Sequence, residues 1–292
     1  ARDYILEENW HFHVRDWKCP TGGVKIDGQL RKQPTLRILS MLERETTMTP
    51  YYAFPKREEG INAVARSETG ENHHVVINGN QSGYDPNPPP PLPTGATKPM
   101  TNLCHGRIIV DGKILKPPSD DRITPPGDPR FGSNLAGPLG NYLGQTNEGS
   151  FVFHGGIVPE TSDLRSAMGG LSTNYKLRDG MFYSQAVGKV NSVTGESMIF
   201  TATHLDGFGG MTALRDAAIR SGLRESLDGE DPSLGGRGCE LLILDGNDAT
   251  ALLYRSPNHE WTGRWHGLHQ VNGVSEYFVS TYLMFECRLP RK

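Results

Sequence analysis

The sequence predicts an α+β fold in which a largely antiparallel or mixed sheet is flanked by a few helices. Short apolar runs that end in Asn-Gly or Asp-Gly turns recur along the chain and are typical of strands. Two other segments show the spacing of apolar residues that is typical of helices. With 35 Gly and 21 Pro in 292 residues, much of the remaining chain must form turns and loops.

The predicted strands follow one another along the chain. Thr35–Leu42 (TLRILSML) fits either a strand or a short helix. His73–Asn78 (HHVVIN) is β-branched and apolar and is followed by a glycine, which predicts a strand and a turn. Residues 107–115 predict a hairpin, because an Asp-Gly pair separates two apolar runs. From residue 151 onward, runs such as FVFHGGIV, QAVGKV and SMIFTATHLDG predict successive strands.

Two segments are predicted to be helices. Residues 59–66 (EGINAVAR) form the shorter one. Residues 212–221 (TALRDAAIRS) form the clearer one, because Thr212 is a good N-cap and Gly222 a natural stop. An apolar strand, ELLILDG, follows this helix after a Gly-rich loop.

Length and composition limit the organisation and the partners. A chain of 292 residues allows one large domain or two modest ones. We expect an N-terminal extension over residues 1–34 and a single domain over residues 35–292. The net charge of −3 gives no reason to expect a nucleic-acid partner.

Other features of the sequence leave compartment and redox state open. No apolar run is long enough to span a membrane, so we expect no membrane partner. The N-terminus lacks a secretory signal, so the protein is expected to be soluble, and either cytoplasmic or exported with its signal removed. The four cysteines would suit two disulfides or four reduced thiols, and no CxxC pair suggests zinc. The oligomeric state is not indicated.

Four segments, in their order and spacing, resemble the phosphodiester glycosidase family. They are VVINGN (75–80), AMGGLSTNYKLRDG (167–180), the long segment that begins SQAVGKV (184–223), and LLILDGNDATALLY (241–254). The best match is GMTALRDAAIRSGL, followed at the family's distance by LILDG. The resemblance covers about residues 35–255. It implies a phosphodiester-glycosidase-like fold and activity on a glycosidic or sugar-phosphate linkage.

The resemblance also implies a site. Asp206 and Asp245 each follow an apolar strand and would be the catalytic carboxylates, since paired carboxylates are the usual glycoside-cleaving apparatus. Without the resemblance, each Asp-Gly pair would equally indicate a simple turn. The residues expected to line the substrate are Asn78, Thr212, Asn247, Asp248 and Thr250.

The sequence departs from the family pattern at charged and small positions. Ser184 stands where the family's "R-T-A-I-G" has its Arg, so a bidentate phosphate-binding charge is missing there. Asn247, Asp248 and Ala249 replace two glycines and a serine of "D-G-G-G-S-T". These changes place the phosphodiester substrate in doubt, and a neutral glycan would suit the site better.

Two histidines are further site candidates. His204 and Asp206 would share a face of one strand and could form an acid–base pair. His154 precedes a Gly-Gly pair and is expected to contact substrate. For each, a solvated or structurally hydrogen-bonded histidine is the alternative. The other histidine pairs lack a third ligand at a recognisable spacing, so no zinc site is expected.

The sequence therefore predicts a glycoside-cleaving enzyme, a hydrolase or lyase, that uses a carboxylate pair on a carbohydrate or sugar-phosphate substrate. The alternative is a catalytically inactive carbohydrate-binding or interaction protein on the same fold. No cofactor is expected. Asp245 and Asp248 would suit a divalent cation, but their spacing matches no calcium-binding loop.

Overall fold

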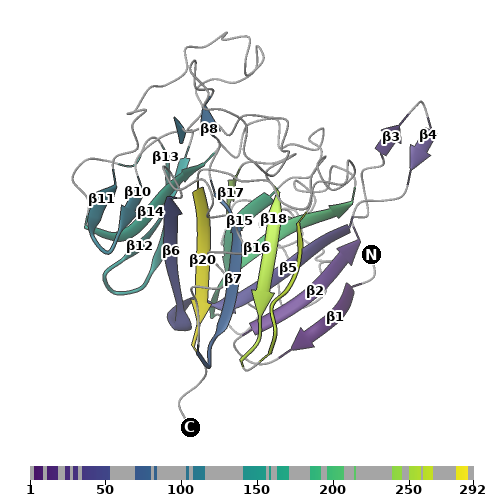
Figure 1. Cartoon of the computed structure of the whole chain (residues 1–292), viewed down its shortest axis with the longest axis horizontal. Helices are drawn as coiled ribbons and strands as arrows, with labels where there is room; N and C mark the ends of the chain where they lie inside the picture. The colour runs from purple at the N-terminus through teal and green to yellow at the C-terminus, as the bar shows by residue number, and fades with distance from the viewer. Residues whose placement is uncertain are drawn as a thin grey trace, which may run out of the picture.

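In the computed structural model most of the described residues form strands, in three larger antiparallel sheets and two small two-stranded ones (Figure 1). The described residues are 3–8, 12–18, 24–26, 29–31, 35–52, 70–79, 82–83, 103–104, 108–115, 141–155, 158, 163–170, 185–191, 196–206, 214, 239–244, 250–257, 259–265 and 281–288.

The first sheet has six strands in the order β1-β2-β5-β16-β15-β17. Their bounds are β1 Asp3–Glu8, β2 Phe12–Lys18, β5 Thr35–Leu42, β16 Ser197–Asp206, β15 Gln185–Asn191 and β17 Cys239–Ile243. Every neighbouring pair is antiparallel. Because β15 lies between β16 and β17, those two strands run in the same direction.

The second and third sheets have five strands each, in the orders β19-β18-β7-β20-β6 and β11-β10-β14-β12-β13. The second comprises β19 Thr262–Trp265, β18 Ala251–Arg255, β7 His73–Asn78, β20 Thr281–Cys287 and β6 Thr46–Tyr52. The third comprises β11 Lys113–Leu115, β10 Ile108–Val110, β14 Leu164–Gly170, β12 Asn141–Thr146 and β13 Phe151–Gly155. The small sheets pair β3 Val24–Ile26 with β4 Gln29–Arg31, and β8 Ser82–Gly83 with β9 Leu103–Cys104.

The predicted α+β class is wrong for the described part of the chain, which is almost entirely β. There, the helical residues are one 3-10 turn, η1 Glu43–Glu45, and Leu214. The predicted helix at residues 59–66 lies outside the described residues, as does the one at 212–221 apart from Leu214. Thr35–Leu42, which fitted either structure, is the strand β5.

The ambiguity of Thr35–Leu42 has a physical cause, because the first sheet is buried on both faces. Leu39 and Met41 face the central core, whereas Leu36 and Ile38 belong to a second cluster on the opposite face. A strand buried on both faces has a continuous apolar run instead of strict alternation, and such a run resembles a helix segment.

Two local predictions are confirmed. The strand β7 has the bounds His73–Asn78, and Gly79 follows it. The hairpin of β10 and β11 turns at Asp111 and Gly112, with φ of 48° and 72°. Both angles lie in the left-handed region, as a two-residue hairpin turn requires.

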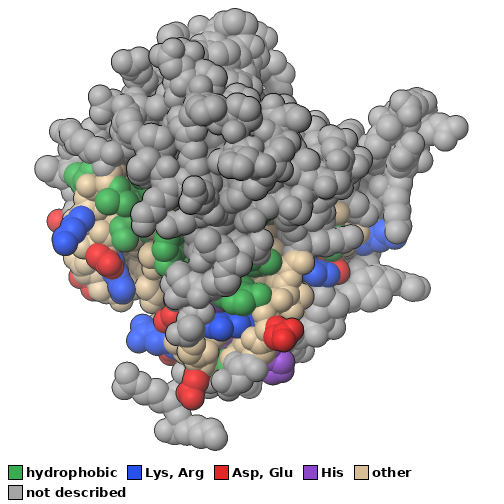
Figure 2. Space-filling view, in the orientation of Figure 1, with side chains coloured by type: hydrophobic (Ala, Val, Ile, Leu, Met, Phe, Trp, Pro, Cys, Tyr) green, Lys and Arg blue, Asp and Glu red, His purple; other side chains and the backbone are tan. Residues whose placement is uncertain are grey.

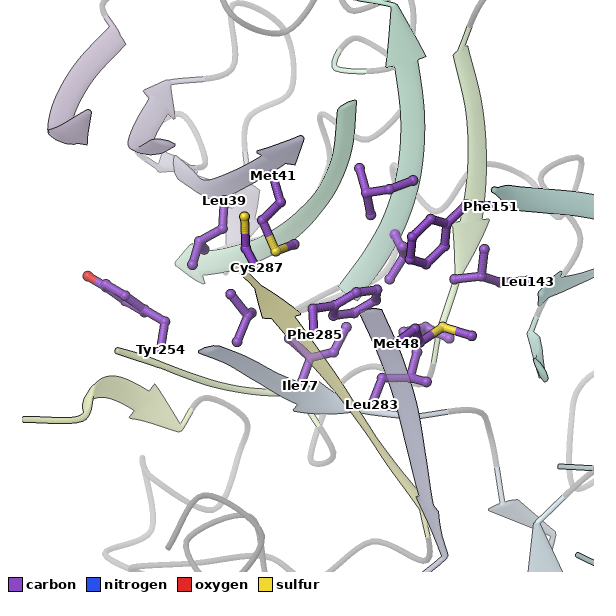
Figure 3. Packing of buried hydrophobic residues seen from close by; sticks show 14 of the residues in the cluster. Leu39, Met41, Met48, Ile77, Leu143, Phe151, Tyr254, Leu283, Phe285 and Cys287 are labelled. Atoms are coloured by element: carbon purple, nitrogen blue, oxygen red, sulfur yellow. The ribbon is translucent and has the colours of Figure 1, made fainter. Parts of the chain in front are cut away.

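The central core is shared by all three larger sheets (Figure 3). Leu39 comes from the first sheet, Ile77 and Phe285 from the second, and Leu143 and Phe151 from the third. The rings of Phe151 and Phe285 lie 6.3 Å apart. The three sheets therefore pack as one body around a common core.

The N-terminal strands pair with this body. β2 pairs with β5 along its whole length, and Phe12 and Val14 of β2 lie fully buried in the central core. Phe12 also stacks on His73 of the second sheet, with ring centroids 4.2 Å apart. The domain boundary at residues 34/35 stays a prediction.

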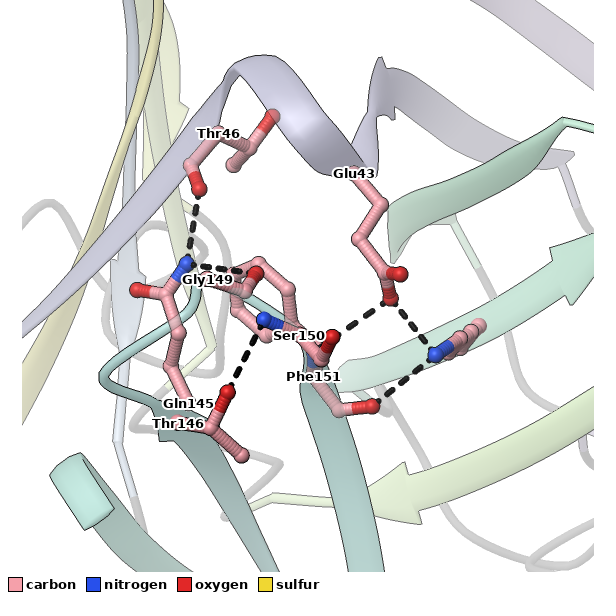
Figure 4. Close-up of polar contacts among 8 residues, drawn as sticks. Glu43, Thr46, Gln145, Thr146, Gly149, Ser150 and Phe151 are labelled. Atoms are coloured by element: carbon pink, nitrogen blue, oxygen red, sulfur yellow. Dashed lines mark hydrogen bonds and ion pairs between the residues drawn. The ribbon is translucent and has the colours of Figure 1, made fainter.

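We call the three packed sheets the sandwich. One end of it is closed by the corner in which β5 passes through η1 into β6. We call this the corner end (Figure 4). There the buried Gln145 amide donates to the carbonyls of Thr46 (2.8 Å) and Gly149 (3.1 Å), and its oxygen accepts from Met48 N–H (3.0 Å). Lys189 pairs with Glu43 at 2.7 Å. These contacts tie all three sheets together.

The reduced Cys287 also lies at the corner end, where β20 ends beside Thr46. Burial raises the pKa of its thiol to about 12. Two disulfides would need all four cysteines, so a thiol at Cys287 argues against that alternative.

Candidate functional site

The opposite end of the sandwich, which we call the loop end, is where β7, β16 and β17 finish and β15, β18 and β20 begin. Leu244 follows β17, and Thr250 precedes β18 in the second sheet. A connection of only five residues joins them, so the two sheets share this end. The ends of strands that carry predicted site residues therefore meet here.

Gln185 is at the centre of the loop end in the first sheet. It pairs with Thr203 of β16 on one side. On the other side, its carbonyl accepts a hydrogen bond from Leu244 N–H at 2.9 Å. Leu244 directly precedes Asp245, and Thr203 lies three residues before Asp206, so Gln185 stands between the strand ends that lead to the two predicted carboxylates.

Asn78 ties the end of β7 to the start of β18. Its side-chain oxygen accepts a hydrogen bond from Ala251 N–H at 3.1 Å, and it is fully buried. Thr250, the residue before Ala251, is also fully buried. The predicted substrate residues Asn78 and Thr250 thus lie close together, and the Asn78 amide has a clear role in positioning β18.

β16 is irregular between His204 and Asp206, the two residues that were predicted to form an acid–base pair. His204 pairs with Leu36, but Asp206 pairs with the adjacent Thr35, so the register shifts at Leu205. Such a bulge interrupts the two-residue alternation that would put His204 and Asp206 on one face. His204 is fully buried and, like Leu36, belongs to the face opposite the central core. Its role in an acid–base pair stays a prediction.

His154 lies in the third sheet on the edge strand β13. It is exposed and contacts the ring of Tyr142 across the strand pair, at a centroid distance of 5.4 Å. Tyr142 and Val152, on the same face, pack in a cluster separate from the central core. Among the site candidates whose side chains are described, His154 thus lies apart from Asn78, His204 and Thr250.

Four other site candidates lie outside the described residues, namely Thr212, Asp245, Asn247 and Asp248. Asp206 is described as part of β16, without its side chain. Within the described ranges no group of three or more His, Cys, Asp or Glu is placed to hold a metal ion. The cation suggested for Asp245 and Asp248 falls outside those ranges.

Three residues at the loop end were missed by the sequence reasoning: Gln185, Thr201 and Thr203. All three are fully buried, and their side-chain polar atoms have no hydrogen-bond partner among the described residues. They share the core-facing side of the first sheet with Val187 and Ile199. The available signal was a glutamine and two threonines at alternate, inward positions of otherwise apolar strands.

The positive charge of Arg37, which lies beside these residues, is paired with the carboxylate of Asp16. Thr203 pairs on its other side with Arg37, whose guanidinium donates to both carboxylate oxygens of Asp16 at 2.8 and 2.9 Å. These hydrogen bonds raise the pKa of Arg37 above its usual value, against the opposing effect of burial. The guanidinium of Arg37 is therefore engaged in its ion pair with Asp16.

The described surface carries mixed charge. On the face drawn in Figure 2, acidic and basic side chains of the described residues are interspersed. Arg44, for example, pairs with Glu196 at 2.8 Å. No helix in the described part of the chain is long and apolar enough to cross a membrane.

Comparisons with known proteins give structural likenesses alone. No family model and no curated protein matches the sequence. The chain is similar to the pro-peptide-inhibited catalytic domain of zebrafish N-acetylglucosamine-1-phosphodiester alpha-N-acetylglucosaminidase, with a TM-score of 0.49 and 13% identity over 99% of this chain and 88% of that one. It is also similar to a hypothetical protein from Synechocystis, with a TM-score of 0.44 and 10% identity over 99% and 64% of the two chains. Scores this low establish neither a family nor an activity.

Proposed function

We propose that this protein is a glycoside-cleaving enzyme, a hydrolase that acts on a neutral glycan with a pair of aspartate carboxylates. Asp206 and Asp245 are the proposed catalytic pair. Thr212, Asn247, Asp248 and Thr250 are the proposed substrate contacts. The assignment comes from the sequence resemblance, and the geometry of the loop end supports it.

The arrangement of β15, β16 and β17 carries this proposal. β16 ends at Asp206, and β17 ends at Ile243, two residues before Asp245. Both strands run in the same direction and finish at the loop end, with β15 between them. Because adjacent strands lie about 4.8 Å apart, β16 and β17 lie roughly 10 Å apart across the sheet.

An inverting reaction by such a pair requires room for a water molecule between the two carboxyl groups. Carboxyl groups about 6.5–9.5 Å apart leave room for a water molecule, whereas about 5 Å is typical of enzymes that form a covalent intermediate. One carboxylic acid would protonate the leaving oxygen while the other carboxylate takes a proton from the attacking water. The sugar product would then have the opposite anomeric configuration.

The test is a hydrolysis screen on neutral aryl glycosides and sugar phosphodiesters. Asp245→Asn removes the charge with little change of shape, and kcat should fall about 10²–10⁴-fold. Asp111→Asn is the matched control, because Asp111 starts an exposed Asp-Gly turn in which Asn is well tolerated. If both variants keep wild-type activity, the assignment of Asp245 is wrong.

A second candidate is a carbohydrate-binding protein without catalysis. The sequence departures at Ser184, Asn247, Asp248 and Ala249 favour it, since they alter the segments that carry the resemblance. It predicts glycan binding by titration calorimetry and no turnover of any bound glycan. Turnover that depends on Asp245 would exclude it.

A further inference from the structure

Gln185, Thr201 and Thr203 form a cluster of buried polar side chains at the loop end. Gln185 and Thr203 lie directly opposite each other on β15 and β16, and Thr201 lies two residues further along the same face. Each is 0% exposed. Within the described part of the chain, both amide atoms of Gln185 and both threonine hydroxyls lack a hydrogen-bond partner.

Such a cluster is costly unless something binds there. A buried amide or hydroxyl without a partner loses its hydrogen bonds to water and gains nothing in return. Native proteins avoid this, and a group of such atoms points to a bound molecule. Three residues on adjacent positions of one sheet face indicate a single site.

The chemistry of the cluster selects a neutral ligand. Gln185 offers two donors and an acceptor, and each threonine hydroxyl can donate or accept. None of the three side chains is charged. The adjacent cation, Arg37, forms a bidentate ion pair with Asp16, so its charge is largely neutralised and it would bind a phosphate weakly. The complete burial of all three side chains selects a small group.

We propose that Gln185 and Thr203, with Thr201 behind them, bind one neutral hydroxyl-bearing group. Its source is either a water molecule or a hydroxyl of a bound sugar. The sugar source rests on the proposed function, whereas the water source does not. In either case Gln185 is a positioning residue between the strand ends that lead to Asp206 and Asp245.

Thermal unfolding of matched variants tests the site without any assay of activity. Gln185→Met and Thr203→Val keep side-chain size and remove the polar atoms. In an occupied site each change leaves the remaining polar groups without one of their hydrogen-bond partners, so Tm should fall by about 2–6 °C. The decrease in Tm of the double variant should be smaller than the sum of the two single decreases. In an empty site each change removes an unpaired polar group. A rise in Tm with additive effects would therefore overturn the proposal.

A crystal structure of the wild type gives a second test that needs no variant. We expect an oxygen atom at about 3 Å from the Gln185 amide and from the Thr203 hydroxyl. The same oxygen in crystals with and without soaked glucose assigns the site to water, and its replacement by a glucose hydroxyl assigns it to the sugar. A site empty in both crystals, or one filled by phosphate in a phosphate soak, overturns the proposal.

Failure of the proposed function would be recognised separately. If the wild type hydrolyses no glycan, the unfolding and diffraction experiments still decide whether the hydroxyl site exists. If it does hydrolyse one and the site takes a sugar hydroxyl, Gln185→Met should raise KM about 10-fold through the loss of one hydrogen bond. An unchanged KM with water retained in the glucose soak restricts the site to water.

Discussion

Two glutamines at opposite ends of the sandwich are equally buried and have opposite surroundings. Gln145 at the corner end is 1% exposed, and its amide makes three hydrogen bonds to backbone groups of β6 and the β12–β13 turn. Gln185 at the loop end is 0% exposed, and its amide makes no hydrogen bond to any residue that the structure describes. The same side chain thus joins two sheets in one place and has no hydrogen-bond partner among the described residues in the other.

The two ends of the sandwich therefore differ in whether the described protein provides hydrogen-bond partners for buried polar side chains. At the corner end, the buried Gln145 and the half-buried Lys189 have hydrogen-bond and ion-pair partners within the protein. At the loop end, the fold holds Gln185 and Thr203 in place and leaves their polar atoms unused. Buried polar groups that a fold does not satisfy are better evidence for a ligand than burial or residue type alone.

Gln145→Met should have the largest effect on stability. The change leaves Met48 N–H and the carbonyl of Thr46 buried without partners, so the free energy of unfolding should fall by about 2–4 kcal/mol. Urea denaturation measures this, with Gln185→Met as the matched variant at the other end, where we expect a smaller loss because no backbone group depends on the Gln185 amide. Equal losses from the two variants would remove the distinction between the glutamines.

Gly79→Ala tests how tightly the loop end is packed. A Cβ at residue 79 would collide with the Thr281 side chain and would lie 2.8 Å from Met168 Sδ, which should cost about 1–3 kcal/mol. Gly144→Ala is the control, because the three atoms nearest to its Cβ all belong to the Leu164 side chain, the closest at 2.6 Å. A leucine methyl can move aside more easily than the short Thr281 side chain. If Gly144→Ala costs as much in denaturation, this explanation is wrong.

Cys287 gives the corner end a pH dependence at high pH. Its thiol stays protonated in the folded protein up to a pKa of about 12, against an unfolded value of 9.0. The unfolded chain therefore loses this proton first, and stability falls as pH rises from 9 toward 12. By pH 10 the loss should reach about 1.4 kcal/mol. Cys287→Val should flatten the stability profile over this range, and an unchanged profile would contradict the shift.

Asn78→Ala should have the smallest effect, about 1 kcal/mol, because it removes the acceptor of Ala251 N–H. Asn78→Asp keeps an acceptor oxygen and should recover part of the loss. Hydrogen exchange at Ala251 is the direct measurement. Unchanged protection in Asn78→Ala would show that this hydrogen bond does not hold β18.

Local features could be predicted from the sequence because their causes are local. The Asp111-Gly112 turn depends on two residues, and the bounds of β7 depend on a β-branched run and the glycine after it. Asn78 and Thr250 lie close together because β7 pairs with β18, and their contact with a substrate stays a prediction. The almost entirely β character of the described chain was not predicted, because strands buried on both faces lack the alternation of apolar and polar residues.

The remaining features depend on contacts between distant segments. The register shift at Leu205 arises where β16 meets the start of β5, about 170 residues earlier in the chain, and no pattern within β16 signals it. Gln185 and Gln145 look alike in the sequence. Only the arrangement of the sheets shows that Gln145 has hydrogen-bond partners and that Gln185 has none in the described ranges.

The corner through η1 also has a consequence for the order of folding. Only the three residues Glu43–Glu45 separate β5 from β6, although these strands belong to different sheets. Pairing β5 with β16 must instead close a loop of about 150 residues, and the entropic cost of closure rises with the logarithm of loop length. The β5–β6 corner can therefore form early and bring two sheets into contact before either sheet is complete. Substitutions at the corner should slow refolding, whereas substitutions at the loop end should mainly speed unfolding.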